Sequence, residues 1–299
     1  YSMLIENNHG DKTIENYLAG FGYTKVAHLY IDDLYIRKEP CPKHSEERHV
    51  PLLRSIAPGT FKLSEGRGSK TPNVQVIPNA IVAATRLTHG TVLDPVPSHP
   101  KDSVPADAKN RAVHKDGFFS QEHQDKWMLD NVFHWAKDGV FFEAGGRDGI
   151  DYSNTYFMEK HLGWTGLVVD ANPVLSAQLH ANRDCVTRAT CLSDKEGDEI
   201  TFLAYNSGIA GIEGSVEADR VKDQLKQRGI DIDSVRTRLQ CHTLTKLFED
   251  ASIDTVDFFS LDIEGHELKA LKGLDLNRIC VYSMLIENNH GDKTIENYL

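Results

Sequence analysis

Long apolar runs are missing from this 299-residue sequence. A helix that crosses a bilayer needs roughly 18 or more consecutive apolar residues, and no such run is present. The beginning of the chain, YSMLIENNHGDK, also lacks the basic and apolar regions of a secretory signal peptide. We therefore expect no membrane span in this chain and a cytoplasmic location.

Positive charge is also in short supply. The sequence has 33 Lys and Arg residues against 44 Asp and Glu residues, which gives a formal net charge of -11. Such a chain repels the phosphate backbone of nucleic acids and has no basic footprint for them. The composition therefore argues against a nucleic-acid partner.

Cysteine is sparse and follows no metal-binding pattern. The five cysteines are an odd number and widely scattered, without a CxxC pair or a Cys/His spacing that fits a zinc site. We expect reduced, mostly buried thiols of an intracellular protein, and no metal ligands. They are Cys41, Cys185, Cys191, Cys241 and Cys280.

An exact repeat is the first feature that is present. Residues 1–18 and 282–299 are identical, with the sequence YSMLIENNHGDKTIENYL. The pattern predicts a buried strand, a turn and the start of a helix. A circular permutant, a piece of a tandem array and a reading frame read around repeated DNA all explain it. Because two identical strands cannot share one slot in a sheet, one copy is loose, artefactual or swapped into a neighbour, as in a strand-swapped homo-oligomer.

Proline divides the chain into three parts. Ten of the eleven prolines lie within residues 39–117, which we interpret as a linker or irregular segment, with a small lid as the alternative. Residues 1–38 continue the repeat with a helix and two β-rich runs that meet at an Asp–Asp turn. Residues 118–299 form the main domain and begin with an amphipathic helix that ends at Gly139.

A glycine turn follows the first strand of the main domain. The apolar run at 140–142 leads into EAGGRDG, and a helix with an apolar face comes next. Glycines without a Cβ allow backbone N–H groups to approach a ligand closely. A nucleotide-like or amino-acid-like ligand fits such a turn. Its glycines are Gly145, Gly146 and Gly149.

An acidic residue ends the second strand. The run TGLVVDANP reaches Asp170, 21 residues beyond Gly149, where a carboxylate can accept hydrogen bonds from both ribose hydroxyls. Asn172 and Pro173 then open the next helix. The combination of a glycine turn with an acid-ended strand is more specific than either feature alone.

A second acidic strand end lies downstream. Thr243 opens a helix, and the buried strand VDFFSLDI then leads into acidic residues and a histidine. Ligands bind at the carboxyl ends of the strands in open α/β sheets. These residues are Asp262, Glu264, His266 and Glu267.

The sequence resembles the FkbM family of methyltransferases, through FFEAGGRDG, VVDANP, CLSD at 191–194 and above all SLDIEGHELKALKGL. The resemblance runs from about Ser120 to Glu287 and continues through Glu6 to Lys38. It implies an α/β, Rossmann-like class I methyltransferase with a seven-stranded, mostly parallel sheet and an antiparallel last strand. The order of the family's segments is permuted in this chain.

The resemblance also implies S-adenosyl-L-methionine as the cofactor. The positions that match the family's motifs lie in the glycine turn, at the ribose-binding acid and in an adenine-side loop, while Arg147 departs from the simplest form of the glycine motif. With the turn residue Asp148 and the helix-opening Asn172, the expected cofactor-binding residues are Glu143, Gly145, Gly146, Asp148, Gly149, Asp170, Asn172, Ser193 and Asp194.

Methyl transfer to a hydroxyl needs the acceptor held in line and a base for its proton. The expected acceptor is a small molecule, a glycan or a lipid with a hydroxyl group. The base candidates are Asp262, Glu264, His266 and Glu287, with His290 or the first copies Glu6 and His9 beside them. A magnesium ion on Asp262, Glu264 and Asn288 is a less favoured alternative.

Two other functions stay open. An NAD-dependent oxidoreductase uses the same strand, turn and acid, but EAGGRDG does not match GxGxxG. A non-enzymatic scaffold keeps the fold without turnover. The acidic and basic stretch at 213–238 is interpreted as a solvated helix, with a cap over the acceptor pocket as the alternative.

Overall fold

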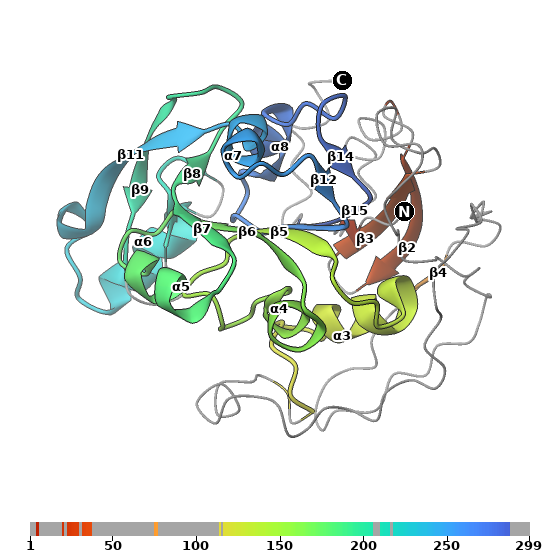
Figure 1. Ribbon diagram of the computed structural model, residues 1–299. Coiled ribbons are helices and arrows are strands. Elements are labelled where there is room, and N and C mark those ends of the chain that lie inside the picture. The colour runs from red at the N-terminus through yellow and green to blue at the C-terminus, as the bar shows by residue number, and fades with distance from the viewer. Residues whose placement is uncertain are drawn as a thin grey trace.

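A computed structural model gives the arrangement of the chain (Figure 1). A large, mostly parallel sheet lies at its centre, and a smaller sheet lies at one end of it. The residues that the structure describes are 4–5, 20, 23–29, 32–37, 75–76, 114, 116–205, 210–215 and 218–287.

The central sheet has nine strands in the order β4-β2-β3-β1-β15-β13-β5-β6-β7. Neighbouring strands from β15 to β7 run parallel, whereas β3 is antiparallel to both β15 and β2. These strands are β1 (Leu4–Ile5), β2 (Tyr23–Leu29), β3 (Asp32–Arg37), β4 (Gln75–Val76), β5 (Val140–Ala144), β6 (Thr165–Asp170), β7 (Val186–Ala189), β13 (Phe258–Leu261) and β15 (Ser283–Ile286).

Helices cover both faces of this sheet (Figure 1). Successive side chains of a strand point to opposite faces, so Phe141 packs with α4 and Phe142 packs with α7. The first face also carries α3, η1 and α5, and the second also carries α8. The helices are α3 (Gln124–Met128), the π-helical η1 (Leu129–Phe133), α4 (Tyr156–Leu162), α5 (Ser176–Asn182), α7 (Leu244–Asp250) and α8 (Glu267–Lys272).

A four-stranded sheet in the order β10-β9-β11-β8 lies beyond β7 (Figure 1). Leu203, Val221 and Leu225 form its small core with α6. Short strands β12 and β14 form a separate pair. These elements are β8 (Cys191–Leu192), β9 (Glu199–Leu203), β10 (Gly211–Ile212), α6 (Ala218–Gln227), the 3-10 turn η2 (Ile232–Val235), β11 (Arg236–His242), β12 (Thr255–Val256) and β14 (Cys280–Val281).

The second copy of the repeat supplies the strand that lies beside β13. β15 pairs with β13, and β1 from the first copy pairs in parallel with β15, Leu4 opposite Leu285 and Ile5 opposite Ile286. Both copies of the strand are therefore in one sheet, in neighbouring slots. Residues 6–18 and 288–299, including the candidate bases Glu6, His9 and His290, lie outside the described residues.

Several expected elements differ in length or number. The sheet has nine strands instead of seven, because the two-residue strands β1 and β4 add to it. The helix expected to end at Gly139 ends at Phe133, since His134 and Trp135 adopt positive φ angles. Asp32 and Asp33 pair within the β2–β3 hairpin and do not form its turn. Most of 39–117 lies outside the described residues, but β4 is part of it.

The expectation of reduced thiols is wrong for three cysteines. Cys191 and Cys241 face each other across β8 and β11 and form a disulfide, and Cys280 is disulfide-bonded as well. Cys185 is the free cysteine in the described part of the chain. The spacing of the cysteines did not predict this disulfide, because the two residues are 50 positions apart and are brought together only by strand pairing. Within the same part of the chain, no helix has the length and apolar character of a membrane span.

We predict that the double substitution Cys191→Ala/Cys241→Ala lowers the free energy of unfolding by about 2–5 kcal/mol, because the unfolded chain regains the freedom of a long loop. The measurement is urea unfolding of both proteins under oxidising conditions. Peptide mapping without reductant is the control for the bond itself. Free thiols at both positions of the wild-type chain, or unchanged unfolding, would contradict the prediction.

Candidate functional site

A cavity of about 420 Å³ opens at the carboxyl ends of β5, β6 and β13. The chain proceeds from β5 to β6 and β7 on one side, and β13 and β15 lie on the other side of β5. Such a reversal of strand order leaves a crevice at the sheet edge where α/β proteins bind ligands. Gly145, Asp170, Asn172, Asp262 and Glu264 of the predicted site residues line this cavity.

Gly145 brings the glycine turn against the end of β13. Its φ is +82°, and a Cβ at this position would lie 1.8 Å from the backbone oxygen of Asp262. Only glycine fits there. The N–H groups of Gly145 and Gly146 both donate to the carbonyl of Val169, at 3.0 and 3.2 Å. The expectation that these N–H groups face a ligand is therefore wrong, because they fasten the turn to β6.

Asp170 ends β6 with both carboxylate oxygens already positioned. Oδ2 accepts a hydrogen bond from the backbone N–H of Arg147 at 2.7 Å, and Oδ1 accepts one from that of Asn172 at 2.7 Å. Each oxygen keeps a second lone pair for a ligand. Burial raises the pKa of Asp170 to about 6, although the two N–H donors and the Arg147 guanidinium oppose this shift. The carboxylate is thus a rigid hydrogen-bond acceptor that is ionised at neutral pH.

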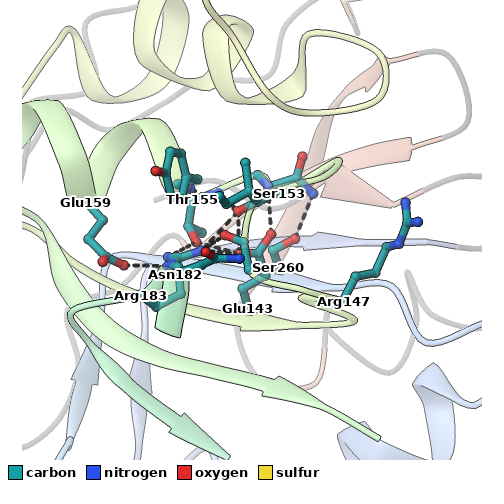
Figure 2. Close-up of polar contacts among 12 residues, drawn as sticks. Glu143, Arg147, Ser153, Thr155, Glu159, Asn182, Arg183 and Ser260 are labelled. Carbon is teal, nitrogen blue, oxygen red and sulfur yellow. Dashed lines mark hydrogen bonds and ion pairs between the residues drawn. The ribbon is translucent and has the colours of Figure 1, made fainter. Parts of the chain in front are cut away.

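Behind the cavity, Arg183 and Glu143 form the centre of a buried polar network (Figure 2). The Glu143 carboxylate accepts hydrogen bonds from the Ser153 and Thr155 hydroxyls at 2.8 and 2.5 Å and from the Asn154 N–H at 2.6 Å. The cation that balances it is Arg183, at 3.3 Å. Glu143 does not line the cavity. Its side chain holds the segment that follows the glycine turn.

The Arg183 side chain is fully buried and reaches several elements (Figure 2). It contacts Glu159 of α4 at 2.6 Å and donates to the Gly149 carbonyl at 3.2 Å. A Cβ on Gly149 would lie 2.9 Å from the Arg183 side chain, so this glycine leaves room for the arginine. Asp148 accepts hydrogen bonds from two following N–H groups and braces the same turn. Both residues shape the turn and lie outside the cavity lining.

The adenine-side loop contributes different residues from those expected. Thr190, Cys191 and Leu192 line the cavity, whereas Ser193 and Asp194 do not. The Ser193 hydroxyl donates to Asp198 at 2.6 Å, and Lys269 contacts Asp198 at 2.7 Å on the same side. The CLSD motif therefore marked the correct loop, but its apolar first half faces the cavity.

Three carboxyl groups, including that of Asp262, meet at the carboxyl end of β13. One oxygen each from Asp262, Glu267 and Glu287 lies within 4.8 Å of the others. Desolvation, followed by the charge of Asp262, raises the pKa of Glu287, and burial raises that of Glu267 to about 8. Like charges this close cannot all be ionised. Glu287 therefore carries a proton and shares it with Asp262, whose side chain is exposed to the cavity.

Glu264 and His266 have different positions. Glu264 lines the cavity, next to Asp262. His266 is absent from the lining, and burial followed by the charge of Lys269 lowers its pKa to about 4. The imidazole is therefore neutral at pH 7. Glu267 accepts hydrogen bonds from the N–H groups of Ile263 and Gly265 and shapes the loop between them.

Several residues that were not among the predicted site residues also line the cavity. Gln121 lies in the segment before α3, where the fully buried Asp125 accepts hydrogen bonds from the N–H and hydroxyl of Ser120. Arg147 and Tyr152 come from the turn after β5. Arg220 belongs to α6, in the stretch for which a cap over the pocket was the alternative. The glycine motif contains Arg147, but the polar groups of the other three reach the cavity only through tertiary folding.

We predict that Arg183→Met lowers the free energy of unfolding by about 3–5 kcal/mol, because Glu143 and Glu159 lose their buried cation. Urea unfolding gives the measurement. Arg188→Met removes the same charge at an exposed position of β7 and should change stability by less than about 0.5 kcal/mol. Equal effects of the two substitutions would show that the network does not hold this part of the fold.

Comparison with known proteins gives one match. The family model of the methyltransferase FkbM domain matches residues 143–298, more than half of the chain. The match begins at Glu143 of the network and includes the ends of β6 and β13, but not the segment from Ser120 or residues 6–38. No curated protein and no solved structure matches the chain. The chain belongs to the FkbM methyltransferase family.

Proposed function

We propose that this methyltransferase uses S-adenosyl-L-methionine and methylates a hydroxyl group of its acceptor. The proposal rests mainly on the position of Asp170, whose carboxylate is held rigidly at the end of β6 and faces the cavity. The cavity has apolar walls on one side and carboxylates on the other. The cofactor has a ribose, an apolar purine and a cationic sulfonium. These three parts have matching surroundings in the cavity.

The nucleoside end of the cofactor fits the part of the cavity between β6 and the small sheet. Leu175, Leu192 and Phe202 supply apolar contacts for a purine. Asp170 offers one free lone pair on each oxygen, an arrangement suited to two neighbouring ribose hydroxyls. The cavity volume also lies within the range of small-molecule sites.

The other end of the cavity fits a sulfonium and an acceptor. Asp262 and Glu264 supply carboxylates that stabilise a cation there. Gly145 keeps the turn close to Asp262, which leaves these groups in a narrow space. The cofactor supplies an electrophilic methyl group. The protein holds the acceptor hydroxyl in line with it and takes up the hydroxyl proton as the new C–O bond forms and the C–S bond breaks.

We assign proton uptake to Asp262. Its carboxylate faces the cavity. Burial raises the pKa of Asp262, which favours proton uptake, and the hydrogen bond from protonated Glu287 opposes this shift and holds the carboxylate in place. Glu287 acts through Asp262 and positions it. Glu264 lies beside the acceptor and orients its hydroxyl. His266 is proposed only as part of the surrounding loop, because it does not line the cavity.

The other expectations rank behind this function. No comparison supports an NAD-dependent oxidoreductase or a scaffold. The acceptor class, whether small molecule, glycan or lipid, stays a prediction, and so does a strand-swapped oligomer. A cytoplasmic location also stays a prediction, and the Cys191–Cys241 disulfide weighs against it because such bonds persist mainly in oxidising compartments.

The function is tested by incubating the chain with S-adenosylmethionine that carries a labelled methyl group and pools of hydroxylated glycans, lipids and small molecules. We expect label in an alkali-stable ether. Asp262→Asn should lower the rate by about 100-fold or more, because the proton acceptor is lost. Asp184→Asn, an exposed site, is the matched control. Label on nitrogen or in an alkali-labile ester would contradict O-methylation of a hydroxyl.

The pKa of Asp170 predicts a pH dependence of cofactor binding. Below pH 6 the carboxylate becomes protonated and loses an acceptor site for the ribose hydroxyls. The dissociation constant of S-adenosylhomocysteine should therefore rise about tenfold between pH 7 and pH 5. Isothermal titration calorimetry measures it. Asp170→Asn should bind more weakly and without this dependence. A flat profile for the wild-type chain would contradict the assignment.

A further inference from the structure

Arg147, in the turn after β5, lacks the carboxylate partners that Arg183 has. Arg183 contacts two carboxylates, Glu143 and Glu159. The half-buried Arg147 makes no ion pair with any carboxylate in the described part of the chain, and its Nε is buried there without a hydrogen-bond partner. A guanidinium is always charged, so removing it from water without an anion is unfavourable.

Backbone and ring contacts hold this guanidinium in place. The backbone N–H of Arg147 is fixed by Asp170, and its φ of 50° sets the direction in which the side chain leaves the turn. The guanidinium carbon lies 4.7 Å from the centre of the Tyr152 ring. Tyr152 is 46% exposed, and both residues line the cavity. In Figure 2 the Arg147 side chain points away from the Glu143 network.

The charges around Arg147 leave it available to a ligand. Asp170 and Asp262 are near enough to interact with it through space, but neither carboxylate is hydrogen bonded to the guanidinium. Asp170 already receives two backbone N–H groups, and Asp262 receives Glu287. A planar guanidinium stacked on an aromatic ring presents its N–H groups in the geometry that matches a carboxylate.

We propose that Arg147 binds a carboxylate of a ligand in this cavity. The proposal rests on the proposed function, in which the cavity holds cofactor and acceptor. Two sources supply the same chemistry: the amino-acid carboxylate of the cofactor and an acidic group on the acceptor. Arg147 lies within the glycine turn, which Gly145 holds close to Asp262 at the end of the cavity proposed for the sulfonium, so the cofactor's carboxylate is the first candidate. Tyr152 beside it covers the apolar side of the bound group.

Two nucleosides separate these sources. S-Adenosylhomocysteine carries the amino-acid carboxylate, and 5′-methylthioadenosine lacks it. We expect Arg147→Gln to weaken binding of the first by about tenfold or more, the loss of a charged hydrogen-bonded pair, and to leave binding of the second unchanged. Arg147→Lys, which keeps the charge but not the fork, should fall between wild type and Arg147→Gln. Arg278→Gln removes an exposed arginine that does not line the cavity and should change neither affinity.

A third probe, isotope-labelled acetate followed by NMR, tests the acceptor. If Arg147→Gln changes neither nucleoside affinity but abolishes acetate binding to the chain saturated with S-adenosylhomocysteine, the carboxylate comes from the acceptor. Equal weakening of both nucleosides, or no change in any of the three, would overturn the proposal. If the wild-type chain binds neither nucleoside, the proposed function fails. Arg147-dependent acetate binding to that chain would still support the carboxylate site, and its absence would overturn both.

Discussion

The buried ion pair between Arg183 and Glu143 is the interaction on which the site depends. It joins the end of β5, the segment after the glycine turn and, through Glu159, helix α4. Because Glu143 is occupied by this network, the acid of the glycine motif serves the shape of the turn. This turn places Gly145 directly against the backbone of Asp262. The buried ion pair therefore helps to set the distance between the ends of β5 and β13, which border the cavity.

The cavity separates its charges along its length. Asp170 is held by backbone N–H groups at the end of β6, and Asp262 is held by a protonated Glu287 at the end of β13. Both carboxylates are thus positioned by protein groups that use only part of their hydrogen-bonding capacity, which leaves remaining lone pairs for ligands. Arg147 adds a cation that interacts electrostatically with both. A molecule with a ribose, a sulfonium and a carboxylate meets a complementary group for each.

The sequence predicted those features that follow from local pattern. The ends of β6 and β13, marked by Asp170 and Asp262, were predicted because apolar runs and acidic ends are adjacent in the chain. The hairpin of β2 and β3 was predicted for the same reason. The Arg183 network, the Cys191–Cys241 bond and the cavity side of the 190–194 loop depend on residues that meet only after folding. A buried arginine has no local signature, and neither does a cysteine paired across two strands.

The most direct test of the account is a crystal structure of the chain with S-adenosylhomocysteine. We expect the ribose hydroxyls on Asp170, the purine against Leu175 and Phe202, and the sulfur on the side of Asp262. A ligand bound outside this cavity, or inside it with the ribose away from Asp170, would contradict the central claim that the ends of β6 and β13 form the cofactor site.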